Sequence, residues 1–311
     1  MVWTQWWNRS HARCYLTGDR ILAADLGALA ISTEIGPEKS RSAVLEFSVD
    51  ENARTHIAKQ FAPYPFHICR PFYVAGDPAG MATVYVQSCA GGIFEHDRLG
   101  LDVHTEQGAR VHLTTSASTI VHSMPEGESR QTVNLVADGE SFIEYLPDPM
   151  ILFPNSRITS CVDVVMHDTA CVILSDAYLM HDHRDQGEAF DWFRSDIVVR
   201  NRNNEILVRD RIRIDGQSIL THIPGVNGRF TAQASFICLA REMSHEGLTL
   251  MRTALDAIEN IYVGVSLLPN GVGVFARILA ADGVALRAAQ LAVWSQARKY
   301  LTGSLPTPRR K

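Results

Sequence analysis

Residues Cys89–Thr119 read CAGGIFEHDRLGLDVHTEQGARVHLTTSAST, and this stretch decides the fold class. A double glycine, Gly91–Gly92, leads into a charged loop. Two segments of alternating apolar and polar residues follow, at Leu101–His104 and Arg110–Thr115, separated by the turn signal Gln107–Gly108. The pattern predicts two half-buried strands that hold a charged loop, an arrangement in which loops commonly carry function.

The same period of two recurs from residue 43 onward, for example at Leu45 and Phe47 and at Val133 and Leu135. Turn signals separate these segments at roughly ten-residue spacing, which favours a sandwich or a solenoid of sheets. Two late segments, 246–262 and 283–301, have helical periodicity instead, and Ser244 is a candidate N-cap for the first. The sequence therefore predicts a mostly β protein with two α-helices in the C-terminal region.

Composition limits the class of protein. The chain has 311 residues and a formal net charge of −5, which argues against the concentrated basic surface that nucleic acids require. Its six cysteines show no CxxC spacing. Because no secretory signal and no run of 18 apolar residues is evident, we expect a cytoplasmic protein with reduced thiols that does not associate with a membrane.

Two clusters contain residues that can ligate a metal ion. Glu95-His96-Asp97 lies in the loop after the double glycine, where neighbouring side chains point in opposite directions and cannot all reach one ion. His181-Asp182-His183 precedes Glu188, and on a strand its two imidazoles would share one face. Solvated loops are the alternative interpretation of both clusters.

Motifs for nucleophilic or cofactor chemistry are not evident: there is no nucleophile elbow, phosphate-binding lysine loop, HExxH helix or dinucleotide fingerprint. Thr114 and Thr115 are predicted to cap a strand end. We therefore expect a protein that is not an enzyme and that has no tightly bound cofactor.

Six pieces in chain order resemble the urease accessory protein D (UreD) family. They are Arg70-Pro71-Phe72, Gly91-Gly92 with Asp97-Arg98-Leu99, Leu113-Thr114-Thr115, Glu144-Tyr145-Leu146-Pro147, Gly187-Glu188-Ala189-Phe190, and Leu291 to Trp294 with Arg298. Glu95 and His96 stand where the family usually has two glycines, and Asp148-Pro149 follows Leu146-Pro147 where the family has a glutamate. The chain thus resembles a divergent member.

The resemblance implies stacked β-sheets in a solenoid-like or β-helix-like arrangement, with helices near the C-terminus. It covers a domain at 43–311 and leaves residues 1–42 as an N-terminal extension, which we expect to be flexible.

The resemblance also implies a scaffold or chaperone for nickel insertion during urease maturation, which forms a complex with the urease apoprotein and accessory proteins F and G, the latter a GTPase. Nickel would bind transiently. Asp97, Glu144 and Glu188 are the carboxylates expected to line its passage, and Gly91, Gly92, Arg98, Thr114 and Thr115 are expected to shape the structural motif.

Two alternatives remain open at this point. The first is a metal-dependent hydrolase that uses His181, His183 and Glu188. The second is a β-sheet interaction module that has lost the urease role.

Overall fold

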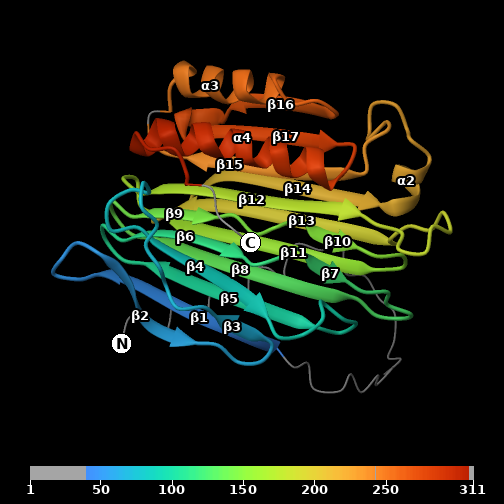
Figure 1. Ribbon diagram of the computed structural model, residues 1–311, viewed down its shortest axis with the longest axis horizontal. Helices are drawn as coiled ribbons and strands as arrows, with labels where there is room; N and C mark the ends of the chain where they lie inside the picture. Colours follow the sequence, from blue (N-terminus) through green and yellow to red (C-terminus); the bar gives the residue numbers. More distant parts are fainter. Residues whose placement is uncertain (1–39, 242, 308–311) are drawn as a thin grey trace, which may run out of the picture. The chain divides into compact units, whose positions relative to one another are not determined.

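The computed structural model describes residues 40–241 and 243–307 (Figure 1). The predicted extension 1–42 therefore lies outside the described residues, except for its last three positions, which belong to the first strand. Within the described residues, no helix is long and apolar enough to cross a membrane.

Two large sheets contain all the strands of the described residues. The seven-stranded sheet has the order β14-β13-β11-β8-β5-β1-β2. Its strands are β1 (Ser40–Val49), β2 (Thr55–Phe61), β5 (Arg98–Thr105), β8 (Ser129–Ala137), β11 (Arg157–Met166), β13 (Trp192–Asn201) and β14 (Ile206–Asp215).

The ten-stranded sheet has the main path β16-β17-β15-β12-β9-β6-β4-β3, with β10 joining β12 and β7 joining β10. Its strands are β3 (Phe66–Ile68), β4 (Ala82–Ser88), β6 (Arg110–Thr115), β7 (Thr119–Val121), β9 (Phe142–Tyr145), β10 (Met150–Leu152), β12 (Cys171–Met180), β15 (Ala232–Leu239), β16 (Ile261–Leu267) and β17 (Gly273–Ala280).

The chain alternates between the two sheets, and this alternation produces the solenoid-like stack. From β4 to β13, successive long strands enter opposite sheets and pair in parallel with the strand one coil earlier. Equivalent residues of successive coils are in register: Leu101, Val133, Val162 and Ile197 form one row of the seven-stranded sheet. These residues are buried between the sheets, so the expected period of two and the stacked fold are both confirmed.

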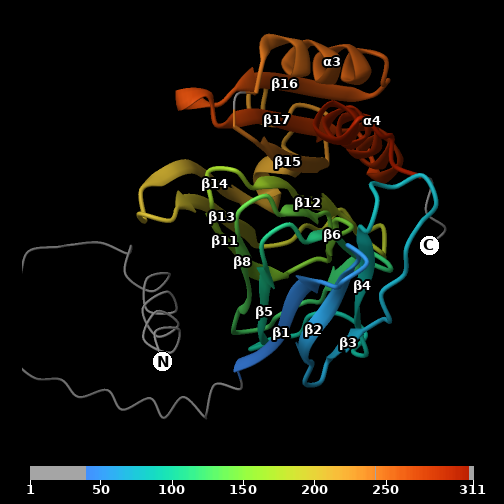
Figure 2. The same ribbon diagram turned by 90° about the vertical axis from the view of Figure 1, so that its left-hand side faces the viewer.

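A second core lies between the ten-stranded sheet and the helices α3 (His245–Asp256) and α4 (Gly283–Thr302) (Figure 2). In β12, Val172 and Leu174 join the core between the sheets, whereas Ile173 and Ala177 join the core under the helices. This sheet is therefore apolar on both faces. Two small helical turns, α2 (Gly216–Leu220) and η1 (Pro269–Gly271), complete the described elements.

The helix ends agree with the sequence in part. Ser244 caps α3 as predicted, with its hydroxyl accepting from the backbone N–H of Glu246. The expectation that this helix reaches Tyr262 was wrong, because α3 ends at Asp256 and the backbone of Asn260 has a positive φ of 59°. The chain turns there into β16, which pairs with β17.

Candidate functional site

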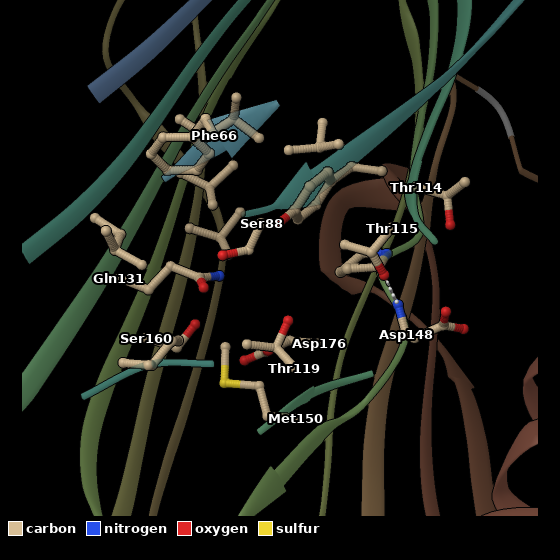
Figure 3. Close-up of a pocket in the computed structure, with 18 of the residues that line it drawn as sticks. Phe66, Ser88, Thr114, Thr115, Thr119, Gln131, Asp148, Met150, Ser160 and Asp176 are labelled. Carbon is tan, nitrogen blue, oxygen red and sulfur yellow. Dashed lines mark hydrogen bonds between the residues drawn. The ribbon is translucent and has the colours of Figure 1, made fainter. Parts of the chain in front are cut away.

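A cavity of about 90 Å³ lies between the two sheets (Figure 3). Gln131 and Ser160 reach it from the seven-stranded sheet, and Asp176 reaches it from β12. Ser160 is 1% exposed, and its hydroxyl oxygen forms no hydrogen bond with the residues that the structure describes. Because a buried polar group without a bond is costly, this cavity is suited to water or another polar occupant.

Asp176 is the buried carboxylate of this cavity. Its side chain accepts a hydrogen bond from the Ser195 hydroxyl. Burial raises the pKa of Asp176, and the nearby Asp210 raises it further. The charged form is therefore disfavoured there unless a cation or a proton offsets it.

A second cavity, of about 200 Å³, lies on the other face of the ten-stranded sheet, beneath α4. Its lining residues come from the sheet, from α4 and from the C-terminal segment: His112, Thr114, Leu146, Pro147, Asp148, Ser175, Phe236, Arg287, Gln290, Leu291, Trp294 and Thr307. Thr114, Pro147 and Asp148 line both cavities. These three residues therefore mark the place where the two cavities approach each other through the sheet.

Hydrogen bonds from Thr114 and Thr115 hold the backbone in position where the two cavities approach each other. The Thr114 hydroxyl donates to the carbonyl of Leu146 at 2.6 Å. The backbone N–H of Asp148 donates to the Thr115 hydroxyl at 2.9 Å, the bond that Figure 3 draws. Both lie at the end of β6, as their predicted capping role requires. Their bonds attach the segment between β9 and β10 to the neighbouring coil.

Glu144 lies at the centre of a buried polar network under α4. Its carboxylate accepts from Arg298 Nε at 2.7 Å, and from the Arg298 Nη2 through a second, short bond. It also accepts from Trp294 Nε1 at 2.9 Å and from His112 Nδ1 at 2.7 Å. Arg298 Nη1 pairs with Asp77 at 2.7 Å. Glu144 and Arg298 are both fully buried, so the network anchors α4 to the sheet.

The network determines the protonation state of Glu144. Burial alone would raise its pKa, but the hydrogen bonds from Arg298 and His112 outweigh burial and lower the pKa to about 2. Glu144 is thus ionised and bonded to three side chains. Metal contact by Glu144 stays a prediction. The contacts that the structure shows for its carboxylate include the hydrogen bonds that anchor α4 to the sheet.

The conformation of the double glycine and of the charged loop after it is fixed by close backbone packing and by hydrogen bonds. Gly92 has a φ of 144°, and a Cβ atom there would lie 2.4 Å from the carbonyl oxygen of Ile120, so only glycine fits.

In the charged loop, Asp97 accepts from the N–H of Phe94 at 2.8 Å, and Arg98 donates to the carbonyl of Glu128 at 2.9 Å. Glu95 accepts from the N–H groups of Gly127 and Glu126, bonds that lower its pKa. These bonds position Asp97 and Arg98, which are both half-buried.

His181 and His183 follow the end of β12 and lie in a loop, not on a strand where their imidazoles would share one face as predicted. Their rings contact the same ring, that of Phe153, with centroid distances of 5.9 and 4.4 Å. Asp182 accepts from three backbone N–H groups, including that of Glu188. The Glu188 side chain is exposed.

The carboxylates expected to act together lie in three separate segments of the chain. Asp97 lies just before β5, Glu144 lies in β9, and Glu188 lies in the loop before β13. Across residues 40–241 and 243–307, no group of three or more His, Cys, Asp or Glu side chains is arranged to hold a metal ion.

Ser160, Asp176 and Asp148 lie outside the motifs that predicted site residues. An aspartate inside the apolar run Val172–Tyr178 was the available signal for Asp176.

The fold and the site define a two-sheet β-solenoid whose helix-covered sheet separates two cavities, each lined mainly by apolar atoms with a few polar side chains among them. The family model described as UreD urease accessory protein matches residues 40–311. The chain therefore belongs to the UreD urease accessory protein family.

Curated relatives agree with this assignment. The chain is 39% identical over 284 residues to urease accessory protein UreD 1 of Pseudomonas syringae pv. syringae, covering 91% of this chain and 99% of that protein. It is 35% identical over 257 residues to UreD 1 of Methylorubrum populi, covering 83% of this chain and 87% of the relative. UreD of Photorhabdus laumondii is 28% identical over 260 residues, covering 82% of this chain and 81% of the relative.

Proposed function

We propose that this chain is a non-enzymatic scaffold that assists nickel insertion into urease in the cytoplasm. In this proposal it binds the urease apoprotein and works with accessory protein F and the GTPase accessory protein G. Nickel is cargo that passes through the protein and is not retained as a cofactor.

The two cavities that share Thr114, Pro147 and Asp148 are the observation that carries the proposal. They offer hydroxyl, amide and carboxylate oxygens on both faces of one sheet, with Asp176 on one side and Asp148 between them. Oxygen ligands bind nickel more weakly than closed sets of imidazole and thiolate ligands do. A passage with such a lining can therefore release the ion.

The anchored helix α4 supports the same proposal, because it forms one wall of the second cavity. Trp294 and Gln290 of α4 line this cavity, and Trp294 is held by its bond to Glu144. Leu291 is 52% exposed on the same helix, whereas Trp294 and Tyr300 make internal bonds. In this proposal the exposed side chain of Leu291 is available for contact with accessory protein F.

Omitting this chain from a heterologous host that expresses the urease subunits and the other accessory genes should leave urease protein that is inactive and poor in nickel. The physical reason is that a buried metal centre cannot load efficiently without a protected route. The measurement is urease activity and nickel per subunit in purified urease, with and without this chain. Equal activity and equal nickel content in both preparations would show that this chain does not serve urease.

A further inference from the structure

The outer face of the seven-stranded sheet has a concentration of arginines at one edge. In β14, Arg209, Arg211 and Arg213 are exposed and alternate with Val208 and Ile212, which are buried. Since residues two apart lie on one face of a strand, these three guanidinium groups project from the same side.

A fourth arginine extends this surface onto the next strand. Arg194 of β13 is exposed and lies directly opposite Arg213 in the strand register. Its guanidinium lies 4.1 Å from the centre of the Trp192 ring. We call Arg194, Arg209, Arg211 and Arg213 the arginine face.

Carboxylates on the protein offset only part of this charge. Arg209 and Arg211 both donate to one carboxylate, that of Asp196. Arg213 donates to the backbone carbonyls of Ser195 and Ile212.

The neighbouring carboxylates already have partners of their own. Asp163 pairs with Arg200, Asp191 with Arg157, and Asp215 caps α2 through Ser218. The arginine face therefore keeps an excess of positive charge in a chain whose net charge is −5.

The spacing of these charges indicates the shape of what they can bind. Successive residues on one face of a strand, i and i+2, lie about 6.8 Å apart. An extended segment with an acidic residue at every second position presents carboxylates at the same interval. Within the described residues, β14 pairs with β13 alone, so its other edge has no strand beside it. Acidic side chains on a segment alongside that edge would face arginines across the pair, a favourable arrangement.

We propose that the arginine face is the docking site for an extended acidic segment of a partner protein, whose alternating carboxylates pair with Arg209, Arg211, Arg213 and Arg194. Guanidinium groups suit this role because they bind carboxylates through two parallel hydrogen bonds. Arginine and tryptophan are also the side chains that most often dominate binding energy at protein interfaces. The inference is independent of nickel handling.

A protein segment fits better than a nucleic acid. The exposed arginines of the arginine face lie on two strands. The same row of the sheet continues to Arg130 and Arg98, which are half-buried. The net charge of −5 of the whole chain disfavours a long polyanion. A short acidic segment meets only the local field, which falls off within about 10 Å at 0.1 M salt. Charges on an edge strand can also serve simply to prevent aggregation, and the experiment below separates these roles.

The test measures binding of a fluorescent octapeptide of alternating Thr and Glu to the full chain by fluorescence anisotropy. The comparison ligands are the same peptide with Gln in place of Glu and a single-stranded RNA octamer. The test variant is Arg194→Gln, Arg209→Gln, Arg213→Gln, which keeps Arg211 to pair with Asp196. The matched control is Arg70→Gln, Arg184→Gln, Arg229→Gln, which removes three exposed arginines elsewhere and gives the same net charge.

We expect saturable binding of the acidic peptide to the wild type and to the control variant, weakened by raising salt. Binding to the test variant should be at least about tenfold weaker, equivalent to ~1.4 kcal/mol. Undetectable peptide binding, or equal loss in both variants, would overturn the proposal. Tighter binding of the RNA would replace it with a nucleic-acid site, and aggregation of the test variant without a change in affinity would assign the arginines to edge protection.

Discussion

Replacing Arg298 with methionine is expected to lower the free energy of unfolding by about 3–5 kcal/mol, the usual cost of leaving one member of a buried ion pair alone. Arg298 is fully buried and bonds to Glu144 and to Asp77, so its removal leaves two buried carboxylates without their cation. Chemical denaturation followed by circular dichroism measures the loss. Lys299→Met is the control, because it removes the neighbouring exposed charge of the same helix and should cost far less.

The same network gives this prediction a pH dependence. The pKa of Glu144 is lowered from 4.5 to about 2 on folding, so the network stabilises the protein fully above pH 4.5 and loses this contribution as the pH falls toward 2. The difference corresponds to roughly 3 kcal/mol. The stability gap between wild type and Glu144→Gln should therefore narrow between pH 5 and pH 2. A gap that stays constant over this range would show that Glu144 is not held ionised by Arg298.

The second large effect concerns the cavity between the sheets. Ser160→Phe places a ring in a space of about 90 Å³ and should reduce urease activation in the heterologous host by more than about tenfold, because the route for the ion is filled. Ser160→Ala keeps the space open and should activate urease normally.

Thermal unfolding of both variants separates blockage from misfolding. Should Ser160→Phe fail to fold, Gln290→Trp provides a second obstruction, in the cavity beneath α4, where the side chain is only half-buried. Gln290→Ala is its control. Full activation by a folded variant with either obstruction would argue against passage of nickel through these cavities.

Much of the fold follows from local pattern. The period of two at Leu45 and Phe47 predicts buried positions of a strand, and both residues are in the core between the sheets. The Ser244 cap is likewise a local feature. The end of α3 was less predictable, because the pairing of β16 with β17 decides where the chain leaves this helix.

The candidate site was less predictable, for physical reasons. Glu144 in a strand resembles any exposed acidic residue of a half-buried sheet, and only the cover provided by α4 makes it buried. Its partner Arg298 lies 154 residues away, so no local spacing could join them, although the resemblance to the family had singled out both residues. His181 and His183 were expected to share one face of a strand, but β12 ends at Met180, so both lie in the following loop.

The most direct test of nickel passage is an anomalous scattering map from crystals of the full chain soaked in millimolar nickel chloride. A passage predicts weak, partly occupied nickel peaks in the two cavities, beside Asp176 and in the region of Thr114 and Asp148. It also predicts that these peaks disappear when the soaked crystals are washed in nickel-free solution. A single fully occupied peak at His181 and His183, resistant to washing, with empty cavities, would contradict the passage and support a metal-dependent hydrolase.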